Sequence, residues 1–294
     1  MTHIVVGYDG TDATEPALRR ALREAEGARA ELRVVTVWRT AAYVGSVPGY
    51  GYDVLPALED IKPQLQQAAE AAVARARTAT GCDQVEVVHE VEPGDAGVRL
   101  VEASTTAELL VVGTRRHNGL VSAIVGSATN YVLHHAQCPV LVVTPDAPAT
   151  WSKVVVGLDD SECAKSALRW AARRAGSAHC PLVVVHAWQL MTSPDWFGAQ
   201  APDRPLYEKQ VQAWMHEVID EVLGDTDLQL QIRSPHDSAP NALLADAGLN
   251  DLLVLGSRGR RGVTDLLLGS VTTTCVHHAT SAVAVLRSGT GPTP

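Results

Sequence analysis

Short runs of apolar, often β-branched residues alternate along the chain with longer stretches typical of helices. Glycine or aspartate bounds each run, as is usual for strands that are buried on both faces. In the first half the predicted strands are Ile4–Tyr8, Leu32–Trp38, Val85–His89, Leu109–Val112 and Val140–Val143. The predicted helices of this half are residues 13–28, 58–80, 96–106 and 127–136.

The second half shows the same alternation. Its predicted strands lie near residues 154–158, 182–187, 228–232, 252–255 and 282–286. Continuous apolar strands that alternate with helices predict a parallel sheet covered by helices on both faces. We therefore expect an α/β protein with two tandem doubly wound domains, each with a five-stranded parallel sheet flanked by helices.

Three segments of the first half recur in the second, in the same order. HIVVGYD at 3–9 returns as KVVVGLD at 153–159, and LLVVGT at 109–114 returns as LLVLGS at 252–257. The long segment at 126–143 returns at 269–286 with its paired histidines. Such an internal repeat predicts two homologous domains. We place them at 1–146 and 151–288, because two prolines among small residues separate them.

The composition narrows the possible partners. The chain has 24 Lys+Arg against 33 Asp+Glu, a net charge of -9, and only 4% aromatic residues. This balance argues against nucleic acid or an anionic membrane as a partner. The first ten residues lack a signal-peptide pattern, no apolar run reaches a membrane span, and the five cysteines form no CxxC pair. We expect a cytoplasmic protein with reduced cysteines.

The glycine-rich loop after the fourth strand of the second half carries the clearest chemistry. It runs Gly256-Ser-Arg-Gly259, and nine residues later Gly269-Ser270 opens a helix. Glycines let backbone N–H groups approach an anion, and a helix start adds free N–H groups and a positive dipole end. With Arg258 this pattern predicts a phosphate site. A tight strand–helix loop with solvated arginines is the alternative at this point.

Asp9 and Asp159 each follow the first strand of their half. Ligands of doubly wound sheets bind outside the carboxyl ends of the strands, where the strand order reverses. A carboxylate there can accept hydrogen bonds from an adenine amino group or from ribose hydroxyls. A helix-capping or turn aspartate is the other interpretation.

Together these residues resemble the universal stress protein family in its tandem, ATP-binding form. The resemblance extends over nearly the whole chain, and the spacing from Gly256 through Gly259 to Gly269-Ser270 matches the family's ATP-binding signature in full. It implies a Rossmann-like fold that binds ATP, alone or with Mg²⁺. Adenine would lie near the first two strands and the phosphates on the glycine loop.

The resemblance also implies the binding residues. In the second half they are Asp159, Ala187, Gly256, Ser257, Arg258, Gly259, Gly269 and Ser270. Their counterparts in the first half are Asp9, Val37, Gly113, Thr114, Arg115, Arg116, Gly126 and Ser127.

The first half departs from the signature at Arg116, which stands where the second half has Gly259. If that position needs positive φ, the arginine costs about 1–2 kcal/mol. Its guanidinium could instead add a phosphate contact. We expect both halves to bind, and the second half to be the stronger site.

The resemblance favours a nucleotide-binding regulatory or stress-response protein that acts through nucleotide-dependent conformation or partner binding. No catalytic or metal-binding set is visible, so we expect slow ATP hydrolysis at most. One alternative is an adenylating or ATP-hydrolysing enzyme with Asp265 or His117 as its base. Another is a nucleotide-free interaction module. The halves are expected to pair as an intramolecular pseudo-dimer, a protein partner is expected, and two chains could associate as a homodimer.

Three further features have structural interpretations. His134-His135 and His277-His278 predict helix C-termini rather than a metal site, because neighbouring residues on a helix point apart. Trp38 and Trp188 are expected to pack at the rim of each sheet. The long loops at 39–57 and 189–205 are predicted to be lids or contact surfaces, with disorder as the alternative.

Overall fold

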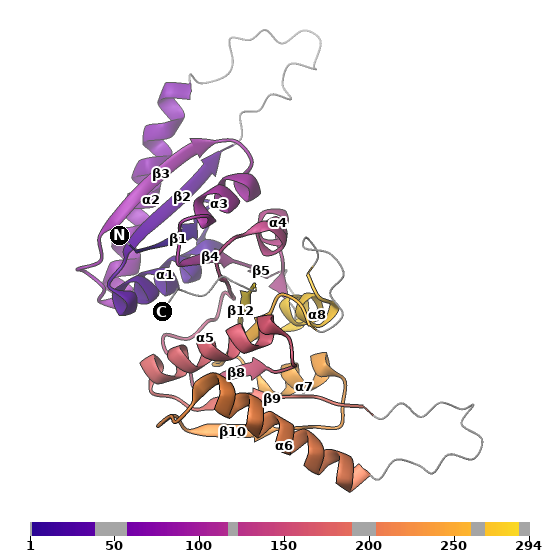
Figure 1. Ribbon diagram of the computed structural model, residues 1–294. Helices are drawn as coiled ribbons and strands as arrows, with labels where there is room; N and C mark the ends of the chain where they lie inside the picture. Colours follow the sequence, from indigo (N-terminus) through magenta and orange to yellow (C-terminus); the bar gives the residue numbers. More distant parts are fainter. Residues whose placement is uncertain (1, 39–57, 117–122, 190–203, 260–267, 288–294) are drawn as a thin grey trace, which may run out of the picture. The chain divides into compact units, whose positions relative to one another are not determined.

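A computed structural model describes residues 2–38, 58–116, 123–189, 204–259 and 268–287 of the chain. The chain divides into two compact units, residues 1–149 and 150–293 (Figure 1). Each unit is an α/β fold with one parallel sheet. No helix among the described residues is long and apolar enough to cross a membrane.

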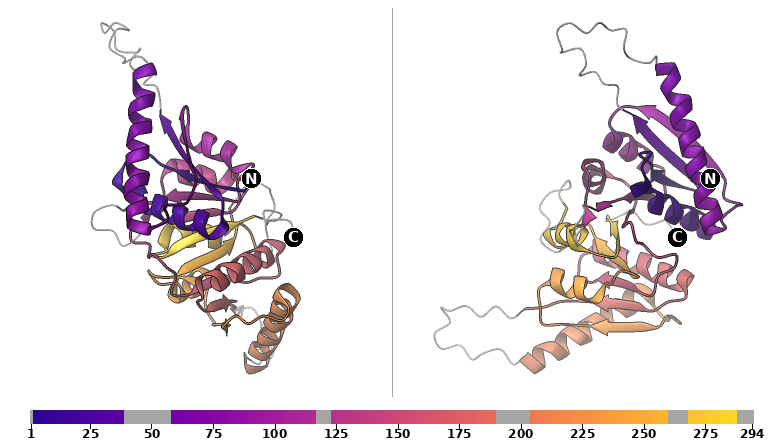
Figure 2. Two further views of the ribbon diagram at one scale, coloured as in Figure 1. Left: turned by 90° about the vertical axis from the view of Figure 1, so that its left-hand side faces the viewer. Right: turned by 180° about the vertical axis from the view of Figure 1, so that it is seen from behind.

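The sheet of the first unit has five parallel strands in the order β3-β2-β1-β4-β7. Their bounds are β1 His3–Gly7, β2 Glu31–Trp38, β3 Val87–Pro93, β4 Leu109–Gly113 and β7 Val140–Val143. The helices are α1 Glu15–Ala28, which follows the short turn η1 Asp12–Thr14, α2 Leu58–Thr80, α3 Ala96–Ser104 and α4 Ser127–His135. Helix α1 packs against α2, and α3 packs against α4 on the other face of the sheet (Figure 2).

The second unit repeats this arrangement with the strand order β10-β9-β8-β11-β12. Its strands are β8 Val154–Gly157, β9 Leu182–Val185, β10 Leu230–Arg233, β11 Leu252–Gly256 and β12 Ala282–Leu286. Its helices are α5 Glu162–Ala178, α6 Arg204–Leu223, α7 Ala239–Asp246 and α8 Ser270–His278. The predicted fold class is confirmed.

The apolar runs form the core because each strand is covered on both faces. Ile4, Val5 and Val6 of β1 are wholly buried, as are their repeats in β8. Burying one such side chain stabilises the fold by about 1.5–3 kcal/mol. This is why the runs in the sequence lack polar positions, and why they were visible without the structure.

Two features of the strands differ from the prediction. Strand β3 spans Val87–Pro93 rather than Val85–His89, and it pairs with β2 as far as Trp38 and Pro93. Polar residues alternate in the second part of β3, because this strand lies at the edge of the described sheet and is only half-buried. The apolar run in the sequence therefore ends before the strand does. A two-residue pair, β5 Arg115–Arg116 with β6 Ala123–Ile124, was not predicted, since it is too short to show a period.

The ends of the helices follow simple backbone rules. Helices α4 and α8 end at the paired histidines, as predicted. Helices α1 and α5 are followed by Arg29 with φ 53° and His179 with φ 49°, both in the left-handed region. Their N–H groups donate to the carbonyl groups of Ala25 and Ala175. These contacts offset a left-handed conformation that costs a non-glycine residue about 1–2 kcal/mol.

Candidate functional site

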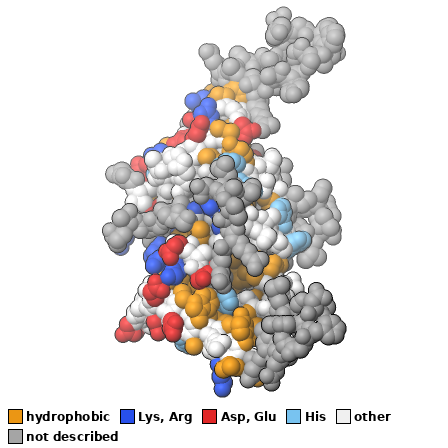
Figure 3. Space-filling view, turned by 45° about the vertical axis from the view of Figure 1, so that its right-hand side comes forward, with side chains coloured by type: hydrophobic (Ala, Val, Ile, Leu, Met, Phe, Trp, Pro, Cys, Tyr) orange, Lys and Arg blue, Asp and Glu red, His pale blue; other side chains and the backbone are white. Residues whose placement is uncertain are grey.

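A pocket of the second unit lies at the carboxyl ends of its strands, with a volume of about 740 Å³. It lies at β8 and β11, which are neighbours in the middle of the sheet. From β8 the chain continues outward to β9 on one side, and from β11 it continues outward to β12 on the other side. This is the switch point at which doubly wound sheets bind ligands. A space-filling view shows hydrophobic side chains grouped near a histidine on one face of this unit (Figure 3).

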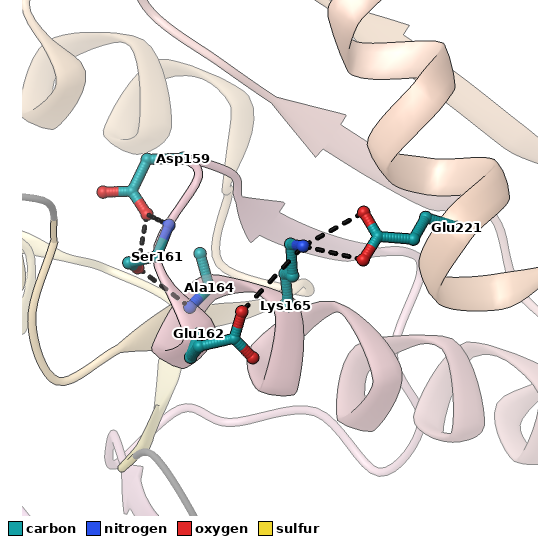
Figure 4. Close-up of polar contacts among 6 residues, drawn as sticks. All are labelled: Asp159, Ser161, Glu162, Ala164, Lys165 and Glu221. Carbon is teal, nitrogen blue, oxygen red and sulfur yellow. Dashed lines mark hydrogen bonds and ion pairs between the residues drawn. The ribbon is translucent and has the colours of Figure 1, made fainter.

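Asp159 enters the pocket directly after β8, with one carboxylate oxygen anchored and the other directed away from its anchor (Figure 4). Its Oδ1 atom accepts hydrogen bonds from the backbone N–H of Ser161 at 3.0 Å and from the Ser161 hydroxyl. The Ser161 hydroxyl also accepts from the N–H of Ala164 and so caps α5. Helix α5 is in turn joined to α6 by the Lys165–Glu221 ion pair at 2.8 Å. Asp159 is therefore held by the capped start of α5.

Gly259 is needed for space rather than for a special backbone conformation. A Cβ atom on Gly259 would lie 2.6 Å from Oδ2 of Asp159, and its φ is not in the left-handed region. The sequence left open whether this position needs positive φ, and the structure shows that Gly259 does not adopt it. The glycine lets the loop backbone approach the Asp159 carboxylate, which a side chain would displace.

Gly256 meets a different neighbour. A Cβ atom there would lie 2.9 Å from Cβ and 3.0 Å from the backbone carbon of Cys163. Cys163 lies in the first turn of α5, so this glycine lets α5 pack against the end of β11. Glycine is therefore required at position 256 for the packing of the fold.

The start of α8 forms the polar end of the pocket. Gly269 caps the helix without a side-chain hydrogen bond, and its own N–H donates to the Ser257 carbonyl at 2.8 Å. The Thr272 hydroxyl donates to the Gly256 carbonyl at 2.7 Å, which ties the helix to the glycine loop. The first N–H groups of α8 and the Arg258 side chain thus give this end positive character.

Much of the remaining lining of the pocket is apolar. Its wall is formed by the ends of β8, β9 and β11 and by α7, through Leu158, Val185, Ala187, Leu243 and Leu255. His186 also lines it, with Nδ1 2.8 Å from the Leu158 carbonyl oxygen and the ring against Trp214 of α6 at 4.7 Å. The lining therefore combines a group of apolar side chains, the apolar slot, with Arg258 and a helix start that attract anions.

The first unit has a smaller pocket at the equivalent place, of about 200 Å³. Asp9 lines it, and its Oδ1 atom accepts hydrogen bonds from the Thr11 N–H and hydroxyl and from the Thr14 hydroxyl. The Thr129 hydroxyl donates to the Gly113 carbonyl at 3.1 Å, as its repeat Thr272 does in the second unit.

Most of the residues predicted from the sequence come together in these two pockets. In the second unit all of them line the pocket except Ser257. Ser257 is buried, and its N–H donates to the Leu286 carbonyl. In the first unit, all line the pocket except Arg115 and Arg116. Those two form β5, and their side chains lie outside the described part of the structure.

Sequence reasoning missed the loop after the third strand. Ala239 and Leu243 of α7 line the second pocket, and Ala96 and Leu100 of α3 line the first. The signal was present, because Asp95 and Ser238 are helix-capping residues that follow the third strand of each half. Trp188 packs away from the pocket, with its Nε1 donating to the Ser234 carbonyl at 2.9 Å.

Several other predictions fall on residues that the structure does not describe. The bases considered for an enzyme, Asp265 and His117, lie outside the described residues, as do the loop 39–57 and most of the loop 189–205. Within the described ranges, no group of three or more His, Cys, Asp or Glu could hold a metal ion. All five cysteines are free thiols.

These features define a class: a tandem Rossmann-like α/β protein with a pocket at the switch point of each sheet. The sequence model of the universal stress protein family matches residues 1–144 and, separately, residues 150–287. The chain therefore belongs to the universal stress protein family.

One known protein with a similar sequence and one with a similar structure each cover nearly the whole chain. A universal stress protein of Mycolicibacterium smegmatis is 28% identical over 292 residues, which cover 97% of this chain and 96% of that protein. The crystal structure of a universal stress protein from Archaeoglobus fulgidus has a TM-score of 0.66 at 18% identity and covers 98% of both chains. A universal stress protein solved in complex with cAMP is similar to 49% of this chain, with a TM-score of 0.36 and 23% identity.

Proposed function

We propose that this chain binds ATP in the pocket of its second unit and acts in the cytoplasm as a regulatory protein. ATP occupancy would alter its conformation or its binding of a protein partner, without dedicated catalysis. The observation that carries the proposal is the 740 Å³ pocket in which the glycine loop, the start of α8 and Asp159 converge. Membership of the universal stress protein family supports it.

The size and chemistry of the pocket suit a nucleotide. Its volume falls within the range of about 300–1,000 Å³ that is usual for small-molecule sites. Adenine would occupy the apolar slot beside Ala187, and the phosphates would lie on Arg258 and the N–H groups of α8. The Oδ2 atom of Asp159 would accept from ribose hydroxyls. Mg²⁺ would be carried mainly by the phosphates, since Asp159 is the sole acidic residue among the described lining residues.

The first unit is proposed as a weaker site for the same ligand. Its pocket of about 200 Å³ lies below the usual range for small-molecule sites, so it must open to admit ATP. It also carries Arg116 in place of the glycine that makes room for Asp159. We expect about one ATP to remain on each purified chain, and a titration to reveal weaker binding in the first unit.

The test is to identify the small molecules released from the denatured protein by mass spectrometry, and then to titrate ATP by calorimetry. The key variant is Gly259→Ala. Its Cβ meets the end of the flexible Asp159 side chain, so the fold can adapt while the carboxylate is displaced. We expect ATP affinity in the second unit to fall at least tenfold. The control is Gly176→Ala on α5, where a Cβ would be in ordinary contact with Leu228 at 3.5 Å.

Two outcomes would overturn the proposal. Absence of ATP binding at millimolar concentration would favour a nucleotide-free interaction module. Rapid multiple-turnover ATP hydrolysis that Gly259→Ala abolishes would instead indicate an enzyme at the same site.

A further inference from the structure

A second polar hollow in the first unit lies away from the pocket at the strand ends. It has a volume of about 230 Å³ and lies between α1, the last turn of α2 and the residues that follow β7. Its walls include Arg19, Arg20 and Arg23 of α1, Ala79 of α2, and Ala147 and Pro148. Three arginines that line one small hollow are unexpected in a chain of net charge -9.

The spacing of the arginines explains why they meet. Arg19 and Arg23 are four residues apart on α1, so their side chains lie on the same face of the helix. Both are half-buried, and neither has a hydrogen-bond or ion-pair partner within the described residues. Arg20 lies deeper, with 6% of its surface exposed, and it donates to the Pro148 carbonyl.

Arg20 differs from the other two arginines of the hollow in its charge balance. Glu24 lies 3.8 Å from Arg20 and offsets its charge. The C-terminal end of α2 contributes about half a negative charge through its dipole. Arg19 and Arg23 form no ion pair within the described residues, so they are the arginines that supply positive charge for a ligand.

We propose that this hollow binds a small anion that carries phosphate groups, of about the size of pyrophosphate. The planar fork of arginine matches the oxygen atoms of phosphate, and two such forks on one helix face can share one ligand. The buried Arg20 holds the Pro148 carbonyl at the rim. A bound anion would therefore link α1 to residues 147–149, the stretch that leads from the first unit to the second.

The second unit also has arginines at the positions equivalent to the two half-buried ones, but not at the position of the buried one. The repeat at an offset of 150 places Arg169, Trp170 and Arg173 where the first unit has Arg19, Arg20 and Arg23. Trp170 is buried and stacks with Arg174, whose guanidinium carbon lies 4.5 Å from the ring centre. The buried cation that holds the rim in the first unit is thus replaced by an indole.

The experiment is a titration of the full chain, labelled with ¹³C at its alanine methyl groups, with inorganic pyrophosphate at constant ionic strength. Ala79 and Ala147 report on the hollow, and Ala187 and Ala239 report on the pocket of the second unit. The two sites are therefore read separately, even if pyrophosphate also enters the second pocket. We expect the Ala79 and Ala147 signals to shift and to saturate.

The double variant Arg19→Gln/Arg23→Gln should raise the apparent Kd read at Ala79 and Ala147 at least tenfold. Arg169→Gln should change it less than twofold. Unchanged signals of the buried Ala17 and Ala72 without pyrophosphate show that the first unit of the double variant is folded. Shifts at Ala79 and Ala147 that survive in the double variant would overturn the proposal. So would an equal response to citrate, because the site would then select charge rather than phosphate.

Discussion

Glycines at matching positions of the repeat have different physical requirements. Gly113 and Gly256 both end the fourth strand of their unit. A Cβ on Gly113 would meet its nearest neighbour, the Ala13 carbonyl oxygen, at 3.5 Å, which is an ordinary contact. A Cβ on Gly256 would meet the backbone of Cys163 at 3.0 Å. Glycine at this position of the repeat is therefore required for packing in the second unit but not in the first.

We expect Gly256→Ala to lower the free energy of unfolding of the second unit by about 1–3 kcal/mol, because overpacking against backbone cannot relax cheaply. Gly113→Ala is the matched control. It should change the free energy of unfolding of the first unit by less than about 0.5 kcal/mol. Urea denaturation of both variants measures the difference, and equal effects would contradict the geometry.

His89 of β3 gives the first unit a dependence on pH. Its Nδ1 is buried with no hydrogen-bond partner within the described residues. Burial lowers the pKa of His89 below its ordinary value, and Arg77 lowers it further, while Glu70 opposes them. The folded state therefore favours the neutral ring.

Because the pKa is lower in the folded state, the unfolded chain takes up a proton first as the pH falls. The free energy of unfolding of the first unit should therefore decrease as the pH falls below about 6.5, until the folded-state pKa is reached. Hydrogen exchange of the β3 amides, followed from about pH 7 to pH 5, measures this decrease in the free energy of unfolding across the ordinary pKa of histidine. His89→Gln should flatten the dependence, whereas His216→Gln on the exposed face of α6 should leave it unchanged.

At the scale of elements, the loops that end α1 and α5 have the same backbone conformation despite different residues. Arg29 and His179 both adopt the left-handed conformation that glycine prefers. The sequence predicted that α1 ends at residue 28, as it does, but it did not predict this conformation. Neither residue is glycine, so the pattern held no signal for it.

Arg29→Gly and His179→Gly should each raise the free energy of unfolding by about 0.5–1 kcal/mol, since glycine relieves the left-handed strain and loses only part of this in chain entropy. Ala28→Gly, inside the last turn of α1, should have the opposite sign. Thermal denaturation compares the three variants. A loss of stability in Arg29→Gly would mean that the arginine side chain makes a larger contribution than its backbone strain.

Element boundaries were predictable where burial on both faces controls the sequence. The core strands β1, β4 and β8 follow their apolar runs closely, because every position must be apolar. The half-exposed β3 does not, because pairing with β2 rather than burial decides where it ends.

At the scale of the whole molecule, the chain carries two copies of one fold with pockets of unequal size, about 740 and 200 Å³. If ATP binds mainly in the second unit, it stabilises that unit selectively. ATP at 100 times its Kd should add about 2.7 kcal/mol to the free energy of unfolding of the unit that binds it. Hydrogen exchange can follow each unit separately. Equal protection of both units in wild type, or selective protection that persists in Gly259→Ala, would contradict the proposed order of affinities.

The sequence alone determined the tandem repeat, the two five-stranded α/β units and the glycine loop next to a helix start. The strands, helices and glycine loop follow from periodicity and short spacings, and the repeat follows from comparing the two halves, so neither needs a contact in the folded chain. Tertiary structure alone decided that Gly259 makes room for Asp159, that α3 and α7 line the pockets, and that the arginines of α1 meet residues 147–149. Each of these depends on distances between residues far apart in the sequence, which only the folded chain brings into contact.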